Sequence, residues 1–232
     1  MIEVQAFDRL GRFKNDWLNA RYHFSFSQYH DPKRMGVGGL RVWNDDEVAP
    51  GTGFDPHPHK EMEIITYVRQ GAITHRDNLG NEGRTEAGDV QAMSAGTGIR
   101  HQERNEGEVP LRLFQIWLRP RENGGLPNWG TRPFPKSDRA GQWAVLASGR
   151  PDDEGALPIR ADARVLGATL KAGQSLSHSW WISRHAYLVP TLGAVSVNGE
   201  RVEAGDGIAI TEESMLIVEA IDDTEVVLVE VF

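Results

Sequence analysis

The sequence predicts an all-β protein built from two related units, and three observations support this prediction. Short apolar runs alternate with clusters of Gly, Asp and Asn, and 25 glycines and 12 prolines among 232 residues supply many turns. No long stretch has the 3.6-residue periodicity of an amphipathic helix. The third observation is an internal repeat, which indicates that one β unit occurs twice.

The repeat pairs residues 63–74 (EIITYVRQGAIT) with residues 185–196 (HAYLVPTLGAVS). Each copy is an apolar strand, a glycine and a second strand. Both copies continue with the tetrapeptide Glu-Ala-Gly-Asp, at residues 86–89 and 203–206, and then with two further apolar strands. Each unit is expected to bury alternating residues between two sheets or inside a barrel.

A segment rich in Pro, Gly and charged residues separates the two copies. It covers residues 119–142 and is predicted to be a linker, with a short helical turn only at residues 135–140. We therefore expect an N-terminal domain of residues 1–135 and a C-terminal domain of residues 136–232.

The composition excludes several classes of protein. A formal net charge of −8, without a long cluster of Lys and Arg, argues against direct nucleic-acid binding. The absence of cysteine excludes disulfides, thiolate metal ligands and a cysteine nucleophile. The N-terminal segment is charged throughout, unlike a signal peptide, and no run reaches the ~18 apolar residues of a membrane helix. We therefore expect a cytoplasmic protein that binds no membrane.

Two pairs of side chains carry the strongest chemical signal. His57 and His59 are two residues apart, and His101 and Glu103 have the same spacing. Side chains at i and i+2 share one face of a strand, so each pair points into a common space. If the two strands are neighbours, three imidazoles and one carboxylate converge, a donor set that suits a divalent transition metal. Either pair alone is also common among surface residues; their combination on two predicted strands favours a metal site.

Other titratable residues near these pairs leave alternatives open. Glu61 and Glu63 have the same strand parity as the two histidines before them, so either is a further ligand or a partner that orients an imidazole. His75 precedes a turn and is expected to be exposed. Most of the other histidines are expected to be ordinary surface or capping residues: His23, His30, His178 and His185.

The second copy of the repeat lacks all four candidate ligands. With the shared glycine and aspartate of the two copies aligned, the corresponding positions hold, in order, Ser179, Trp181, Val218 and Ala220. His178 is one residue out of register and is therefore expected on the opposite strand face. We expect the C-terminal domain to be metal-free, with apolar side chains filling the former site.

At these residues the chain resembles the cupin superfamily. The first cupin motif is matched by Gly51, His57, His59, Glu63 and Gly71, and the second by Gly88, Gly98, His101 and Asn105. Residues 15–120 resemble more closely the pirin family and its bacterial quercetinases. The matching segments include His23-Phe24-Ser25-Phe26, Leu40-Arg41-Val42, Asn44-Asp45-Asp46, His57-Pro58-His59, Met93-Ser94-Ala95-Gly96 and Leu113-Phe114-Gln115-Ile116-Trp117.

The resemblance implies a bicupin: two β-barrel domains that face each other, with metal only in the N-terminal one. It implies that the metal ligands are His57, His59, His101 and Glu103. Glu63, which the general cupin motif would make a ligand, is then not expected to bind the metal. Iron (Fe) is the first metal expected, and nickel, cobalt, copper, manganese and zinc suit the same donor set.

The resemblance further implies a metal-dependent dioxygenase that opens the heterocycle of flavonols such as quercetin with O2 and releases CO. Four protein ligands leave open positions at which a flavonol can chelate, and Glu103 is the candidate catalytic base. The alternative is a metal-containing regulator that binds a protein partner without turnover. A monomer is expected in either case.

A flat aromatic substrate requires an apolar pocket with few polar groups. Five side chains are candidate wall residues, with plain core packing as the alternative for each: Met93, Phe26, Phe54, Phe114 and Ile116.

Overall fold

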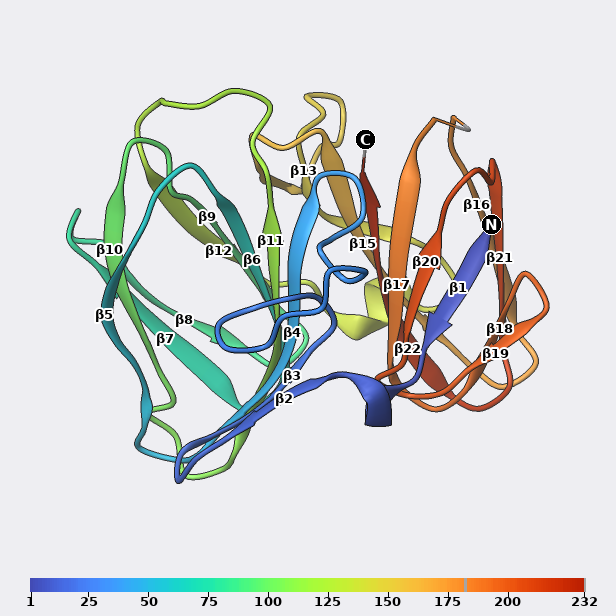
Figure 1. Cartoon of the computed structure of the whole chain (residues 1–232), viewed down its shortest axis with the longest axis horizontal. Helices are drawn as coiled ribbons and strands as arrows, with labels where there is room; N and C mark the ends of the chain where they lie inside the picture. The colour runs from blue at the N-terminus through green and yellow to red at the C-terminus, as the bar shows by residue number, and fades with distance from the viewer. Residues whose placement is uncertain (182, 232) are drawn as a thin grey trace.

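The computed structural model describes residues 1–181 and 183–231, and it confirms an almost wholly β protein with two barrel-like halves (Figure 1). Two 3₁₀ helices, η1 (Phe7–Arg9) and η2 (Lys136–Arg139), are the helices of this described part. Neither is long and apolar enough to cross a membrane. The short turn expected at residues 135–140 is thus confirmed as η2.

The N-terminal half is a seven-stranded sheet packed on a four-stranded sheet. The larger sheet has the order β12-β9-β6-β11-β4-β3-β2, and the smaller one has the order β5-β10-β7-β8. The strands of this half are β2 (Gly11–Lys14), β3 (Leu18–Tyr22), β4 (Leu40–Val48), β5 (Gly53–His59), β6 (Glu63–Gln70), β7 (Ala72–Asp77), β8 (Glu82–Glu86), β9 (Val90–Ser94), β10 (Ile99–Arg104), β11 (Leu111–Leu118) and β12 (Asn128–Arg132).

The C-terminal half repeats this arrangement. Its larger sheet has the order β1-β20-β17-β22-β15-β13-β14, and its smaller one has the order β16-β21-β18-β19. Its strands are β1 (Ile2–Gln5), β13 (Ala144–Ser148), β14 (Leu157–Pro158), β15 (Ala163–Leu170), β16 (Ser175–Ser179), β17 (His185–Leu192), β18 (Val195–Val197), β19 (Glu200–Val202), β20 (Gly207–Ile210), β21 (Met215–Ala220) and β22 (Thr224–Val231).

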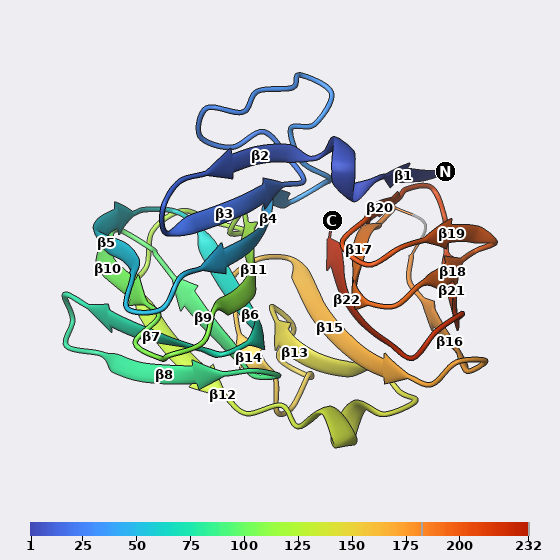
Figure 2. The same cartoon turned by 90° about the horizontal axis from the view of Figure 1, so that it is seen from below.

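Two segments lie elsewhere than the sequence suggested. β1 pairs with β20, with Ile2 opposite Ile210, so the first strand belongs to the sheet of the C-terminal half (Figure 2). β12, inside the expected linker, pairs with β9 as an edge strand. Strand periodicity indicates that a segment forms a strand, but it does not show which other strand it pairs with in the sheet. The division at residue 135 therefore stays a prediction.

The two seven-stranded sheets pack against each other across a shared apolar core. Trp43, Tyr67 and Phe114 of the N-terminal half lie in one buried cluster with Tyr187 and Val229 of the C-terminal half. Because the larger sheets are covered on both sides, strands such as β11 and β22 are apolar on both faces. The arrangement confirms the expected pair of barrels that face each other.

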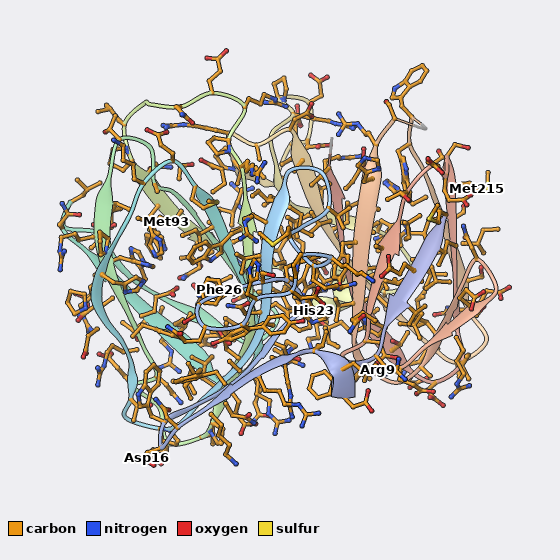
Figure 3. The ribbon with its side chains drawn as sticks, in the orientation of Figure 1. Arg9, Asp16, His23, Phe26, Met93 and Met215 are labelled. Atoms are coloured by element: carbon orange, nitrogen blue, oxygen red, sulfur yellow. The ribbon has the colours of Figure 1, made fainter. Side chains whose placement is uncertain are left out.

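One histidine expected at the surface lies in this interface instead. His23 is fully buried where the two halves meet (Figure 3), and its Nδ1 lies 2.9 Å from the Tyr187 hydroxyl. The Arg34 guanidinium donates to the His23 carbonyl and to the same hydroxyl. Burial lowers the pKa of His23 to about 3, so the ring is neutral in the folded protein at neutral pH.

The C-terminal barrel is filled by apolar side chains, but β16 turns toward the interior the face that was expected to point outward. Val218 and Ala220 are in its core as predicted, whereas Ser179 and Trp181 are exposed. β16 turns His178 inward instead, where Nε2 lies 3.1 Å from the buried Glu230 carboxylate. The expectation that His178 lies on the outer face is therefore wrong.

Candidate metal centre

The four-stranded sheet of the N-terminal half positions the site. β10 lies between β5 and β7, and His101 is directly opposite His57 on one side and Asp77 on the other. Glu103 is opposite His75. The two ligand-bearing strands are therefore neighbours, which is the condition for a shared site, and a third strand, β7, adds a histidine and an aspartate.

A glycine makes the close approach of β5 and β10 feasible. The register between these strands shifts between His101 and Glu103, at a bulge. There Gly53 has φ +156°, and a Cβ at this position would lie 2.2 Å from the Glu103 carbonyl oxygen. Any side chain at residue 53 would push the two strands apart, so the glycine that precedes Phe54 is a packing requirement of the site.

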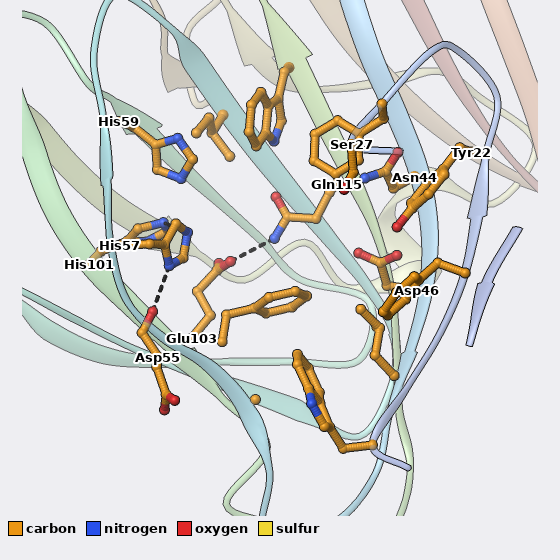
Figure 4. A pocket seen from close by; sticks show the side chains of 18 of the residues that line it. Tyr22, Ser27, Asn44, Asp46, Asp55, His57, His59, His101, Glu103 and Gln115 are labelled. Atoms are coloured by element: carbon orange, nitrogen blue, oxygen red, sulfur yellow. Dashed lines mark hydrogen bonds between the residues drawn. The ribbon is translucent and has the colours of Figure 1, made fainter. Parts of the chain in front are cut away.

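The three candidate imidazoles converge in the cavity (Figure 4). The ring centroids lie 4.5 Å apart for His57 and His101, 4.8 Å for His57 and His59, and 4.9 Å for His59 and His101. One nitrogen of each ring lies within 4.8 Å of the others. Nε2 of His57 and Nε2 of His101 are 3.1 Å apart. Two ligands at ~2.0–2.1 Å and at right angles about one metal would be about 2.9 Å apart, so the rings fit a shared ion.

Hydrogen bonds set which nitrogen of each ring is free. His57 Nδ1 lies 2.7 Å from the Asp55 carbonyl, an acceptor, so Nδ1 carries the hydrogen and Nε2 holds a lone pair. His75 donates from Nε2 to Asp77 (3.1 Å), which makes its Nδ1 an acceptor for His101 Nδ1 at 3.3 Å. His101 Nε2 then also holds a lone pair. Two lone pairs therefore face each other, an arrangement that a bound cation stabilises.

His75 is the residue whose role the sequence interpretation missed. It is fully buried, not exposed as expected, and its ring stacks on Trp129 of β12 with a centroid separation of 4.5 Å. Its i, i+2 spacing to Asp77 was the available signal, since it matches the spacing of the other pairs. It joins His101 and Glu103 in a second group whose ligand atoms lie within 4.8 Å of one another.

The buried rings are held in the form that binds metal. Burial and the neighbouring histidines lower the pKa of His101 to about 2, and burial together with His57 lowers that of His59 to about 4. Neutral imidazole is the ligand form, so no proton must be displaced from either ring at neutral pH.

Glu103 is buried, lines the same pocket as the rings and is held by three donors. Its Oε1 accepts from Gln91 Nε2 at 2.6 Å and from Thr66 Oγ1 at 3.4 Å, and its Oε2 accepts from Gln115 Nε2 at 2.7 Å. Burial raises the pKa of Glu103 to about 7 although each of these donors lowers it. A carboxyl group that titrates near neutral pH is suited to take and return a proton.

The other two acidic candidates face away from the site. Glu61 accepts from the backbone N–H of Gly124, and Glu63 accepts from Ser94 Oγ and from the backbone N–H of Arg160. The turn at residues 60–62 contains Glu61 with φ 52°, so strand parity does not continue from β5 into β6. Glu63 thereby tethers the two halves of the chain.

A pocket of about 470 Å³ opens in front of the histidines. The four candidate ligands line it, together with aromatic walls from several strands. The aromatic lining residues are Phe13, Trp17, Tyr22, Phe26, Phe54 and Trp117. The pocket is thus mostly apolar, with polar groups at defined places, as a site for a flat aromatic molecule requires.

Three of the five expected wall residues do not line this pocket. Phe26 and Phe54 are in the wall, but Met93 lies in the core beside it. Phe114 and Ile116 point into the core between the two halves, because β11 turns Gln115 and Trp117 toward the pocket. The β11 sequence is apolar on both faces, so the pattern could not indicate which face lines the cavity.

The comparisons with known proteins agree with this geometry. The family model described as Pirin matches residues 3–118, and the one described as quercetinase C-terminal cupin domain matches residues 145–231. A pirin-like protein of Caulobacter vibrioides is 58% identical over 230 residues, covering 99% of each chain. The quercetin 2,3-dioxygenase of Escherichia coli strain K12 is 38% identical over 229 residues, covering 98% of this chain and 97% of that protein.

Among solved structures, the crystal structure of a bacterial pirin from Escherichia coli in complex with nickel(II) matches with a TM-score of 0.93. It is 36% identical, and the match covers 100% of this chain and 99% of that one. The His and Glu cluster in this chain is accordingly a site suited to a divalent metal. Since the relatives align over almost the whole chain, the protein belongs to the pirin family of the cupin superfamily.

Proposed function

We propose that this protein is a metal-dependent dioxygenase that opens the heterocycle of flavonols such as quercetin. Its ligands are His57, His59, His101 and Glu103. The observation that carries the proposal is the convergence of three imidazoles at the end of a mostly apolar pocket of about 470 Å³. The sequence similarity to a quercetin 2,3-dioxygenase supports the same activity.

The three imidazoles can share one divalent ion, and Glu103 would complete the donor set from the adjacent group that it forms with His101 and His75. Three imidazole nitrogens and a carboxylate oxygen suit iron, nickel, cobalt, copper, manganese and zinc. Iron is our first expectation, and the Escherichia coli pirin structure contains nickel. When bound, the ion would act as a Lewis acid on the hydroxyl and carbonyl oxygens of the flavonol and lower the pKa of that hydroxyl.

The chain itself supplies a base, orientation and a water-poor surface. Glu103 accepts the hydroxyl proton, and Gln91 and Gln115 hold its carboxylate in place for this transfer. Phe54 and Trp117 contact the faces of the flat ring system and exclude water from it. The deprotonated flavonol is then electron-rich enough to react with O2.

The overall reaction is balanced without a further reductant. O2 takes electrons from the flavonol, two bonds of the heterocycle break, and one carbon leaves as carbon monoxide. Both oxygen atoms of O2 are retained in the products. The protein needs only to return the proton that Glu103 accepted.

Turnover with defined metals tests the proposal. Protein loaded separately with iron, nickel, cobalt, manganese and copper is mixed with quercetin, and oxygen uptake and carbon monoxide release are measured. We expect equimolar uptake and release with at least one metal. Absence of turnover with every metal would refute the dioxygenase proposal. It would favour the alternative, a metal-containing regulator that binds a protein partner.

A single substitution tests the ligand assignment. His59→Ala is expected to abolish stoichiometric metal binding, measured by elemental analysis after dialysis. The free energy of unfolding of the metal-free protein should change by only about 1 kcal/mol, because His59 is half-buried and accepts no structural hydrogen bond among the described residues. Unchanged metal content would refute the assignment.

A further inference from the structure

A second polar group lies across the pocket from the histidines. Tyr22 of β3 and Asn44 and Asp46 of β4 belong to the seven-stranded sheet, whereas the histidines belong to the four-stranded one. In Figure 4 the side chains of these three residues point into the pocket from the side opposite His57 and His59. The proposed metal chemistry does not use them.

Two oxygen atoms of this group lack a hydrogen-bond partner within the described part of the chain. Asp46 is 3% exposed and Asn44 is 4% exposed, yet Oδ1 of each has no hydrogen-bond donor among the residues that the structure describes. Asp45, the residue between them, differs in that its carboxylate forms an ion pair with the Arg69 guanidinium. Buried acceptors without a donor are rare in folded proteins, so an acceptor pair that lines a cavity indicates a ligand that donates hydrogen bonds.

The groups between the two polar ends restrict the shape of that ligand. Trp117 and Phe26, which line the pocket, form a series of ring contacts from His59 to Tyr22, with centroid separations of 4.9, 5.4 and 5.2 Å. Phe54 lines the pocket beside His57, with their ring centroids 6.3 Å apart. A ligand that reaches both ends must therefore be flat and aromatic in its middle part, carry metal-binding oxygens at one end and carry hydrogen-bond donors at the other.

We propose that Tyr22, Asn44 and Asp46 form a subsite that binds phenolic hydroxyl groups on the part of the substrate remote from its metal-binding oxygens. This inference rests on the proposed function and names its substrate class: aromatic chelators that carry at least one further phenolic hydroxyl. An analogue without that hydroxyl leaves the buried acceptors unpaired, and a site of this kind discriminates against such analogues strongly.

Two flavonols provide matched probes. Quercetin has ring hydroxyls in addition to its hydroxyl and carbonyl pair, whereas 3-hydroxyflavone has that pair and no other hydroxyl. Both are titrated without oxygen into the metal-loaded protein, and binding is followed by tryptophan fluorescence. We expect the wild-type protein to bind quercetin at least tenfold more tightly than 3-hydroxyflavone.

The variant Asp46→Ala should remove this preference. We expect its affinity for quercetin to fall about tenfold, the cost of leaving one buried phenolic hydroxyl without its acceptor, and its affinity for 3-hydroxyflavone to change by less than about twofold. Asp46→Asn keeps the side-chain volume and one acceptor oxygen, so it should reduce the preference by less. Glu47→Gln is the control, because it removes a carboxylate from the same strand that pairs with Arg112 outside the pocket.

The ratio of the two affinities distinguishes the subsite from an indirect effect. Metal content is measured for each variant, and a change in the metal centre would weaken both probes equally because both chelate in the same way. If Asp46→Ala weakens the binding of both probes equally, or of neither, the proposed subsite is refuted. The proposed function is unaffected by either result. A metal-loaded wild-type protein that binds neither probe refutes the proposed function and the subsite with it.

Discussion

The relay from Asp77 through His75 to His101 makes a prediction about metal affinity. In this relay Asp77 fixes the His75 tautomer, and His75 accepts the hydrogen of His101 Nδ1, so that His101 Nε2 faces His57 Nε2 at 3.1 Å. The substitution His75→Phe removes both nitrogens but keeps an aromatic ring that can stack on Trp129, as the present ring does with planes 6° apart. The fold should therefore be retained while the relay is lost.

The expected loss follows from one hydrogen bond. Hydrogen bonds that involve a charged group are worth about 1.5–3 kcal/mol, and a neutral ring separates the Asp77 charge from His101, so the lower value applies. Since 1.4 kcal/mol is a factor of about ten, the affinity for a divalent metal should fall about tenfold. Outer partners of metal-bound histidines in general contribute about 10–100-fold, which sets the upper bound.

Competition against a chromogenic chelator of known affinity measures this change. Zinc and nickel are titrated into mixtures of chelator and metal-free protein, for the wild type and for His75→Phe. His30→Phe is the control, because His30 is exposed and lies on a loop away from the relay. Equal affinities for wild type and His75→Phe would show that His101 is oriented by its strand alone, and the proposed relay would be wrong.

Two further predictions concern the interface between the halves. Arg139 is 1% exposed and pairs with the buried Glu225, so Arg139→Leu should lower the free energy of unfolding in urea by about 3–5 kcal/mol. Lys136 is a half-exposed partner of the same carboxylate, so Lys136→Met should lower it by about 1 kcal/mol or less. Equal effects of the two substitutions would contradict the role of burial. Because the pKa of His23 is lowered to about 3, its contribution to stability is complete above its unfolded pKa of about 6.5 and is lost as the pH falls toward 3. His23→Gln should therefore reduce the slope of unfolding free energy against pH between about pH 4 and 6 by up to about 1.4 kcal/mol per pH unit, and an unchanged slope, equal to that of the control His30→Gln, would refute the buried neutral ring.

The repeat and the spacing of polar residues allowed much of this structure to be predicted. The strand, glycine, strand pattern at residues 63–74 and 185–196 corresponds to β6–β7 and to β17–β18. The i, i+2 spacing was enough to place His57 with His59, and His101 with Glu103, on one face of a strand, because strand geometry alone dictates which side chains share a face. Local rules of this kind depend only on residues that are near in the sequence.

What could not be predicted depends on turns and on packing between distant strands. A gapless alignment assumes equivalent connections in the two halves, but three residues separate β5 from β6 and five separate β16 from β17, so the alignment could not show which face β16 turns inward. The burial of His75 depends on Trp129, a residue of the expected linker that folds back as β12. Neither the length of a turn nor the return of a linker is encoded in the periodicity of one strand.

The two sheets of the N-terminal half contribute different side chains to the pocket. The four-stranded sheet holds the imidazoles and Glu103, and the seven-stranded sheet holds Asp46 and Gln115. The separation between the histidines and Asp46 is therefore set by how the two sheets pack. The outer face of the larger sheet is in turn fixed by the C-terminal half, through a core that contains Trp43 and Tyr187. Because buried cores of this kind resist deformation, the C-terminal half supports the sheet from which Asp46 and Gln115 reach the pocket.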